Sequence, residues 1–197
     1  MSRCYNFSAG PAVLPEDVLA EAQANMLDYK GAGFSIMECS HRGKEFEPVI
    51  NEARANILKL MGLGDDYCVL FLTGGASFQF AQIPLNLLGA GQTADYINTG
   101  TWAAKAIKEA KLVGNVNVSA DTSKSKPARM PTQAELKLTP GAAYVHMTTN
   151  ETIAGSQFKT MPVVEAPLVA DMSSDIFSRP LDFSKFGLVY AGAQKNI

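Results

Sequence analysis

The sequence lacks most of the features that mark secreted, metal-binding or membrane proteins. Its 197 residues include only three cysteines and two histidines. The cysteines, at positions 4, 39 and 68, show neither CxxC nor Cys/His ligand spacing, so neither a disulfide framework nor a metal site is predicted. The amino terminus lacks the apolar segment of a signal peptide, and no apolar run approaches the length of a membrane span. We therefore expect a reducing, cytoplasmic compartment, no membrane contact and no bound metal.

The sequence also lacks a charge imbalance. It has 17 basic and 19 acidic residues, a formal net charge of −2, and no run of like charges. Such a composition offers no electrostatic footprint for nucleic acid or an anionic membrane. With 47% apolar residues, the chain is long enough to bury a sizeable core. These properties favour small-molecule chemistry.

What the sequence does contain is an alternation of strands and helices. Apolar residues at helical spacing predict helices over residues 15–29, 46–60 and 103–112, and one that starts near residue 78. Short apolar runs predict strands over residues 69–72, 94–98, 115–120, 142–147, 169–170 and 188–190, and residues 34–43 are expected to be extended. This alternation predicts an α/β fold, a mostly parallel sheet with helices on both faces. Residues 1–14 are interpreted as an irregular arm and residues 15–197 as one domain.

Lys195 follows the last predicted strand and three small residues, 191–193. A free lysine amine has a pKa of roughly 10.4, and desolvation or a neighbouring cation lowers it, which frees the lone pair for attack on a carbonyl. The small residues leave room for a flat ring, such as the pyridine of pyridoxal phosphate. Most lysines after strands are solvated loop residues, so the interpretation needs partner residues.

Asp171 is the first such partner, because it follows the apolar run 169–170 at the carboxyl end of a predicted strand. It precedes Lys195 by 24 positions (195 − 171), enough for one crossover between neighbouring strands. A pyridoxal enzyme needs a carboxylate that keeps the ring nitrogen protonated. An aspartate after a strand can instead be only a helix cap. The two residues together are more specific than either alone.

Further candidates also follow predicted strands or precede helices. Glycines 74 and 75 lie between a strand and a helix, where free N–H groups and the helix dipole bind anions. Trp102 is the only tryptophan, which fits either a core residue or a ring that stacks on a ligand. Arg42 is suited to binding an oxyanion with two hydrogen bonds, or to a surface salt bridge. Ligands of parallel sheets bind beyond the carboxyl ends of the strands, which predicts one site there.

Ordered blocks along the whole chain resemble one family. The blocks are Asn6–Pro11, Ser40–Phe46, Gly74–Phe80, Pro84–Gly89, the run 94–111, Asn150–Ile153, Ala170–Asp175 and Tyr190–Asn196. They are similar to the phosphoserine aminotransferases, which are class V, fold-type I enzymes that depend on pyridoxal 5'-phosphate. The resemblance implies that the chain is the amino-terminal part of such an enzyme, because family members continue for nearly as much chain again beyond the lysine. The rest of the large domain and the small domain would then be absent.

The resemblance also implies a role for each matching residue. Lys195 holds the cofactor aldehyde and moves the proton, and Asp171 pairs with the ring nitrogen. Trp102 stacks on the ring, and Thr152 donates its hydroxyl to the ring oxygen. The remaining residues bind anions: Ala76, Ser77 and Gln194 hold the cofactor phosphate, and Arg42, with His41 nearby, contacts the substrate.

The implied reaction transfers an amino group between L-glutamate and 3-phosphohydroxypyruvate in serine biosynthesis, giving phosphoserine and 2-oxoglutarate. The related phosphohydroxythreonine of vitamin B6 synthesis is a further implied substrate, and a homodimer with shared active sites is expected. One alternative is another class V enzyme, such as a cysteine desulfurase or a glyoxylate-linked aminotransferase. Desulfurases typically place histidines where this chain has Trp102 and Gln194. The other alternative is a truncated, non-catalytic chain.

Overall fold

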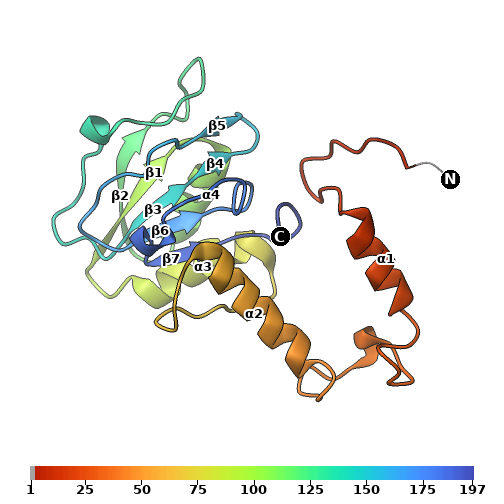
Figure 1. Cartoon of the computed structure of the whole chain (residues 1–197). Helices are drawn as coiled ribbons and strands as arrows, with labels where there is room; N and C mark the ends of the chain where they lie inside the picture. Colours follow the sequence, from red (N-terminus) through yellow and green to blue (C-terminus); the bar gives the residue numbers. More distant parts are fainter. Residues whose placement is uncertain (1–2) are drawn as a thin grey trace. The chain divides into compact units, whose positions relative to one another are not determined.

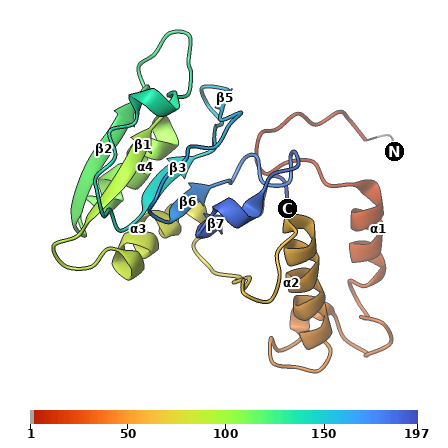
Figure 2. The ribbon, with the colours of Figure 1, turned by 60° about the vertical axis from the view of Figure 1, so that its left-hand side comes forward.

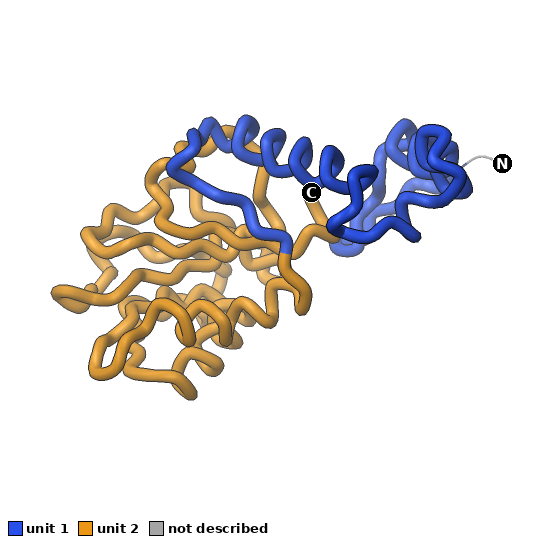
Figure 3. The backbone as a smooth tube through the Cα atoms, turned by 90° about the horizontal axis from the view of Figure 1, so that it is seen from below, with its two compact units in different colours: residues 1–71 blue, residues 72–197 orange. Residues whose placement is uncertain are grey.

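The computed structural model describes residues 3–197. They form two compact units, one ending at Phe71 and one spanning Leu72–Ile197 (Figure 3). Residues 3–15 carry no helix or strand. The expected division into an arm of residues 1–14 and a domain of residues 15–197 stays a prediction.

The first unit contains two α-helices and a short 3₁₀ helix: α1 (Glu16–Ala24), η1 (Ile36–Glu38) and α2 (Glu47–Met61). α2 confirms the predicted helix, with a proline in its first turn and Gly62 as a left-handed cap. α1 ends earlier than predicted. None of its residues is buried, so no packing stabilises a longer helix, and Lys30 and Gly31 turn the chain with positive φ. The segment expected to be extended instead contains η1, because Ser35 and Glu38 form a capping box.

The second unit is built on a five-stranded parallel sheet (Figures 1 and 2). Its strands follow the order β2 (Asn115–Asp121), β1 (Thr93–Asn98), β3 (Val145–Thr148), β6 (Leu168–Asp171) and β7 (Leu188–Tyr190). The remaining elements are α3 (Gly75–Leu87), α4 (Thr101–Ala110), the antiparallel pair β4 (Asn150–Glu151) and β5 (Ser156–Gln157), η2 (Gln133–Glu135) and η3 (Phe183–Lys185). This arrangement confirms the predicted α/β fold and its mostly parallel sheet.

Residues of one sheet face form the core with α3 and α4. The strand register puts Tyr96, Val169 and Tyr190 on the same face, since side chains alternate along a strand. They pack with α3 through Phe80 and with α4 through alanines that let the helix approach closely. This packing fixes both helix amino termini near the carboxyl ends of the strands, and α4 begins at Thr101, after a short loop from Asn98 at the end of β1 (Figure 1).

The predicted strand over residues 69–72 is wrong. The segment has no strand pairing among the described residues, and Leu70, Phe71 and Leu72 are exposed, Leu70 by 68%. An apolar run becomes a strand only where a neighbouring strand satisfies its backbone groups. The other predicted strands are confirmed with shifted bounds, of which the largest shift is from residues 142–147 to Val145–Thr148.

No helix within residues 3–197 is long and apolar enough to cross a membrane. Over the same residues, no group of three or more His, Cys, Asp or Glu side chains is arranged to hold a metal ion.

Candidate active site

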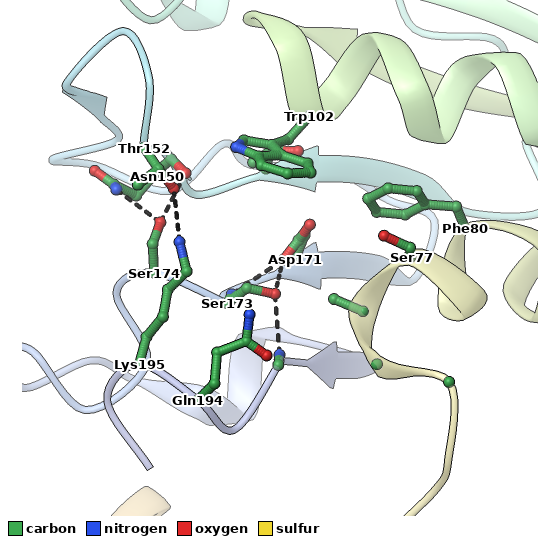
Figure 4. Close-up of a pocket in the computed structure, with 15 residues that line it drawn as sticks. Ser77, Phe80, Trp102, Asn150, Thr152, Asp171, Ser173, Ser174, Gln194 and Lys195 are labelled. Carbon is green, nitrogen blue, oxygen red and sulfur yellow. Dashed lines mark hydrogen bonds between the residues drawn. The ribbon is translucent and has the colours of Figure 1, made fainter. Parts of the chain in front are cut away.

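A pocket of about 170 Å³ lies within the second unit, at the carboxyl ends of the strands (Figure 4). Several elements contribute to its wall: the amino termini of α3 and α4, the ends of β3 and β6, the turn after β4 and the segment after β7. The predicted cofactor residues all line this one pocket: Ala76, Ser77, Trp102, Thr152, Asp171, Gln194 and Lys195.

The amino terminus of α3 supplies free backbone donors to the pocket. Gly74 and Gly75 have φ of 90° and 62°, and α3 then begins with Gly75, Ala76 and Ser77 in its first turn. Within the described chain no side chain caps this terminus, and its first turn holds no acidic residue. Its N–H groups and the positive end of the helix dipole are therefore available to an anion.

Gly74 is required here by a close approach as well as by its φ. A Cβ on this residue would lie 2.7 Å from the Cβ of Phe78. The turn that aims α3 at the pocket therefore excludes every residue other than glycine.

Asp171 is the last residue of β6 and projects into the pocket (Figure 4). Its Oδ1 accepts hydrogen bonds from the Ser173 amide (3.0 Å) and the Ser173 hydroxyl (2.6 Å). The Gly192 amide donates to the same hydroxyl (3.1 Å), which links β6 to the segment that carries Lys195. Burial raises the pKa of Asp171, and the bonds from Ser173 oppose that rise. A cationic ligand atom at this carboxyl would be stabilised.

Lys195 reaches the pocket from the segment after β7. Its Nζ donates to the Thr152 hydroxyl at 3.4 Å, in the turn between β4 and β5 (Figure 4). Asn150 holds this turn in place, because its amide donates to the Ser174 hydroxyl (2.8 Å), which donates to the Asn150 carbonyl (3.1 Å). A primary amine in a partly enclosed pocket is suited to bond formation with an aldehyde.

Trp102 lies in the first turn of α4 and forms the opposite wall of the pocket from Lys195 and Gln194 (Figure 4). The Lys105 ammonium lies 4.3 Å from the centroid of its ring, a cation–π contact that holds the indole. An aromatic face in this position is suited to stacking on a flat ligand.

Glu151 positions Trp102 and was missed by sequence reasoning. It is fully buried, and its carboxylate accepts from the amides of Trp102 (3.1 Å) and Ala103 (3.0 Å) and from the Thr99 hydroxyl (3.3 Å). It therefore caps α4 from 48 residues away along the chain. Gly100 makes room for it, since a Cβ there would lie 2.8 Å from the Glu151 side chain. No local pattern predicts a cap from so distant a residue.

Ser173 was also missed as a site residue, although a signal for it exists. An aspartate followed two residues later by serine is typical of a turn in which the carboxylate accepts from that serine. The sequence Asp171-Met172-Ser173 has this spacing.

His41 and Arg42, the predicted substrate residues, belong to the first unit and not to the described pocket of the second. Both are exposed and lie in the turn before α2. Their role stays a prediction.

The family is shown by comparison with known sequences. The family model of the class-V aminotransferases matches residues 4–197, so the chain belongs to that family. The relatives it resembles at high identity are phosphoserine aminotransferases. It is 57% identical to the one from Desulfosudis oleivorans over 99% of this chain, and 56% identical to the one from Niallia circulans over 99% of this chain. The chain spans about half the length of these curated relatives, 54% in each case.

Solved structures agree with the sequence comparison. The phosphoserine aminotransferase from Bacillus circulans subsp. alkalophilus matches with a TM-score of 0.94 at 56% identity, over 98% of this chain and 54% of its own. A pyridoxal-phosphate-bound phosphoserine aminotransferase from Trichomonas vaginalis matches with a TM-score of 0.92 at 41% identity, over 98% of this chain and 58% of its own. The fold of the described residues is therefore that of the amino-terminal half of these enzymes.

Proposed function

We propose that the protein uses pyridoxal 5'-phosphate to transfer an amino group between L-glutamate and 3-phosphohydroxypyruvate, giving O-phospho-L-serine and 2-oxoglutarate. The observation that carries the proposal is a single pocket that combines a primary amine (Lys195), a buried carboxyl (Asp171) and an uncapped helix amino terminus (α3). These are the three groups needed to bind an aldehyde, a ring nitrogen and a phosphate. The similarity to phosphoserine aminotransferases supports the choice of substrates.

Several polar groups in the pocket have no hydrogen-bond partner among the described residues, which fits a site for such a polar cofactor. Among residues 3–197, the buried Thr148 hydroxyl and the buried Trp102 Nε1 have no hydrogen-bond partner, and both residues line the pocket. The first-turn amides of α3 are free as well. Buried polar groups without partners are costly, so a polar ligand that contacts them stabilises the site.

The chemistry supplied by pyridoxal phosphate is electron withdrawal from the substrate carbon by its protonated ring. Residues of this chain are proposed to bind and orient the cofactor and to move the proton. Asp171 holds the proton of the ring nitrogen, the indole of Trp102 fixes the ring plane, and the Thr152 hydroxyl orients the ring oxygen. Ala76, Ser77 and Gln194 bind the phosphate. With the cofactor bound, Lys195 would hold its aldehyde until the substrate amine replaces the lysine, and the freed Nζ would move a proton between the substrate carbon and the cofactor carbon.

Further parts of the proposal concern substrate, assembly and compartment. Arg42 is proposed to bind the substrate anion, with His41 beside it, because a guanidinium matches carboxylate and phosphate geometry. The phosphohydroxythreonine of vitamin B6 synthesis is a second proposed substrate. A homodimer with shared active sites and a cytoplasmic location are also proposed. The location is supported by free cysteines at positions 4, 39 and 68.

The first test is covalent trapping of the cofactor. The chain is incubated with pyridoxal phosphate, reduced with borohydride, digested and analysed by mass spectrometry. A phosphopyridoxyl group on Lys195 is expected, with none in Lys195→Ala. Lys185→Ala is the matched control, since that exposed lysine lies in η3 and should leave the labelling unchanged. Labelling spread over surface lysines would contradict the proposal.

The second test is amino transfer from glutamate to a panel of oxo acids. Turnover with 3-phosphohydroxypyruvate supports the proposal, and preference for glyoxylate, or release of sulfide from cysteine, supports another class V activity. Specific labelling of Lys195 without any turnover would mean that this chain binds the cofactor but is not catalytic. That outcome would match its span of about half of its relatives.

A further inference from the structure

Two buried polar side chains, those of His146 and Tyr190, lie in the core of the second unit and outside the pocket. His146 in β3 is 1% exposed, and its Nε2 lies 3.0 Å from the hydroxyl oxygen of Tyr190, the last residue of β7. Tyr190 is itself 8% exposed. Neither residue lines the pocket. The functional roles assigned above leave both polar groups unexplained, although burying them is costly.

The strand register brings these side chains together on one face. Asp171 pairs with Tyr190 between β6 and β7, and Tyr96 pairs with His146 between β1 and β3. The His146 ring stacks on Tyr96 with centroids 4.7 Å apart, and the Tyr96 hydroxyl shares a 2.8 Å hydrogen bond with Tyr144. The titratable groups around His146 are therefore the phenols of these three tyrosines and, beyond Tyr190, the Asp171 carboxyl.

His146 is neutral in this environment. Its complete burial lowers its pKa to about 3, and no carboxylate contacts its ring to oppose that effect among the described residues. A neutral imidazole has one N–H donor and one acceptor nitrogen. Which nitrogen carries the proton decides the direction of the hydrogen bond to Tyr190.

The unpaired nitrogen indicates the tautomer. Nδ1 of His146 is buried and has no hydrogen-bond partner within residues 3–197. An orphaned N–H is rarer in proteins than an orphaned acceptor. The proton therefore belongs on Nε2, which donates to the Tyr190 oxygen. The Tyr190 hydroxyl then has its own proton free for another acceptor.

The strand register offers Asp171 as the acceptor, because Asp171 is paired with Tyr190 on the same sheet face. Burial raises the pKa of Tyr190 well above its ordinary value, and the charge of the nearby Asp171 adds to the rise. A phenol that keeps its proton can donate a hydrogen bond, and an ionised carboxylate acts only as an acceptor of hydrogen bonds.

We infer that Tyr190 and His146 are positioning residues for Asp171: His146 Nε2 donates to the Tyr190 oxygen, and the Tyr190 hydroxyl donates to the Asp171 carboxylate. With the two donors of Ser173, the carboxylate then receives three hydrogen bonds that favour its charged form and fix its direction. The inference rests on the proposed function only in naming the ring nitrogen as the group that Asp171 meets.

The first experiment reads the tautomer directly and needs no cofactor. The chain has only two histidines, so His41→Gln leaves His146 as the single imidazole. Long-range ¹⁵N–¹H NMR of this variant, labelled with ¹⁵N-histidine, should show a neutral ring protonated at Nε2 that does not titrate between pH 5 and 8. A ring protonated at Nδ1, or one that titrates in this range, would overturn the inference.

The second experiment uses a matched pair of variants, Tyr190→Phe and Tyr144→Phe. Both remove a buried hydroxyl on the same sheet face, but the Tyr144 hydroxyl bonds to Tyr96 and not to His146. Because a hydrogen bond to a charged group is lost, pyridoxal phosphate should bind roughly tenfold more weakly to Tyr190→Phe. The acid limb of its binding profile should also move to higher pH. Tyr144→Phe should change neither quantity.

Equal effects in the two variants would mean a structural role only and would contradict the inference. If the unsubstituted chain binds no pyridoxal phosphate, the proposed function fails, and the tautomer measurement still decides the inference. The same measurement decides it if Tyr190→Phe does not fold.

Discussion

At the scale of single residues, the pocket holds a carboxyl that costs stability. Asp171 is buried, and burial is the largest cause of its raised pKa. The folded chain therefore binds this proton more tightly than the unfolded chain, so the contribution of Asp171 to stability is greatest at low pH and falls as pH rises through its folded pKa. Active sites often carry such a cost, because the same burial strengthens the interaction with a ligand.

The first prediction follows from the upward shift in the pKa of Asp171. In the absence of ligand, Asp171→Asn should be more stable than the unsubstituted chain at neutral pH. The difference should shrink as pH falls below the folded pKa of Asp171 and vanish below the pKa of an unfolded aspartate, roughly 3.9. The amide oxygen of asparagine can still accept from Ser173. Urea unfolding across pH 3 to 8 measures the free energies. A variant that is less stable at neutral pH would contradict the prediction.

The second prediction concerns Glu151, which caps α4 and thereby holds Trp102. Glu151→Ala leaves three donors without an acceptor, two of them buried and one partly buried, and should lower the free energy of unfolding by roughly 2–4 kcal/mol. Trp102 is the only tryptophan, so its fluorescence reports the loss of the cap without interference. Glu165→Ala, at an exposed position, is the control and should change neither the stability nor the spectrum. An unchanged emission spectrum in Glu151→Ala would refute this role.

The sequence correctly predicted the pocket residues that lie at the end of a strand or at the start of a helix. Asp171 and Trp102 were found in this way, because parallel strands bring their carboxyl ends to one edge. It missed Glu151 and His146, whose partners lie 48 and 44 residues away, since no local pattern records such contacts.

At the scale of elements, the amino terminus of α3 is the proposed binding site for the phosphate. Its first turn is aimed at the pocket by Gly74 and Gly75, and within the described residues no side chain occupies its free donors. The length of α3 is limited as well, since it ends at Leu87, three residues after Pro84.

The third prediction tests this element. Gly74→Ala introduces a Cβ at 2.7 Å from Phe78 and should destabilise the chain by about 1–3 kcal/mol. It should also narrow the difference in affinity between pyridoxal phosphate and pyridoxal, since only the former carries the anion. Both affinities are measured by absorbance titration.

Gly91→Ala is the matched control for that measurement. Gly91 also has a positive φ, of 77°, but a Cβ there would meet no atom of the described residues within 4 Å. It should lower the stability by about 1 kcal/mol through backbone strain alone and leave the affinity ratio unchanged. If both variants alter the ratio equally, the amino terminus of α3 is not the phosphate site.

The two segments whose structure was predicted wrongly differ from the prediction for the same physical reason. Residues 69–72 have the composition of a strand, and residues 25–29 continue the apolar spacing of α1, yet neither segment forms the predicted structure. Apolar pattern stabilises an element only if something covers its apolar side chains. α2, with its proline and glycine caps, carried enough local information for both of its ends to be predicted.

At the scale of the whole molecule, the pocket belongs entirely to the second unit. Every residue that lines it lies between Gly74 and Lys195. Residues 68–72, at the boundary between the two units in the sequence, have no regular structure, and all of them except Val69 are exposed.

The fourth prediction is that a protease specific for aromatic and large apolar residues cuts early at Leu70, Phe71 or Leu72. Exposed backbone outside helices and strands is the preferred site of cleavage. A fragment that begins near residue 72 should persist and should keep the capacity for labelling at Lys195. Mass spectrometry of a time course identifies the cuts. Early cleavage inside the sheet strands would contradict the division into units.

The sequence by itself determined the class of this protein. The order of strands and helices predicts a parallel sheet, and the motifs at strand ends predict Lys195, Asp171 and Trp102 as neighbours, because strand ends converge by topology alone. Only the tertiary structure decided which distant side chains support them: Glu151 at α4, Ser173 between Asp171 and Gly192, and Tyr190 with His146 beneath the pocket. These contacts depend on the register between strands and on packing across the sheet, and a local sequence pattern holds no information about either.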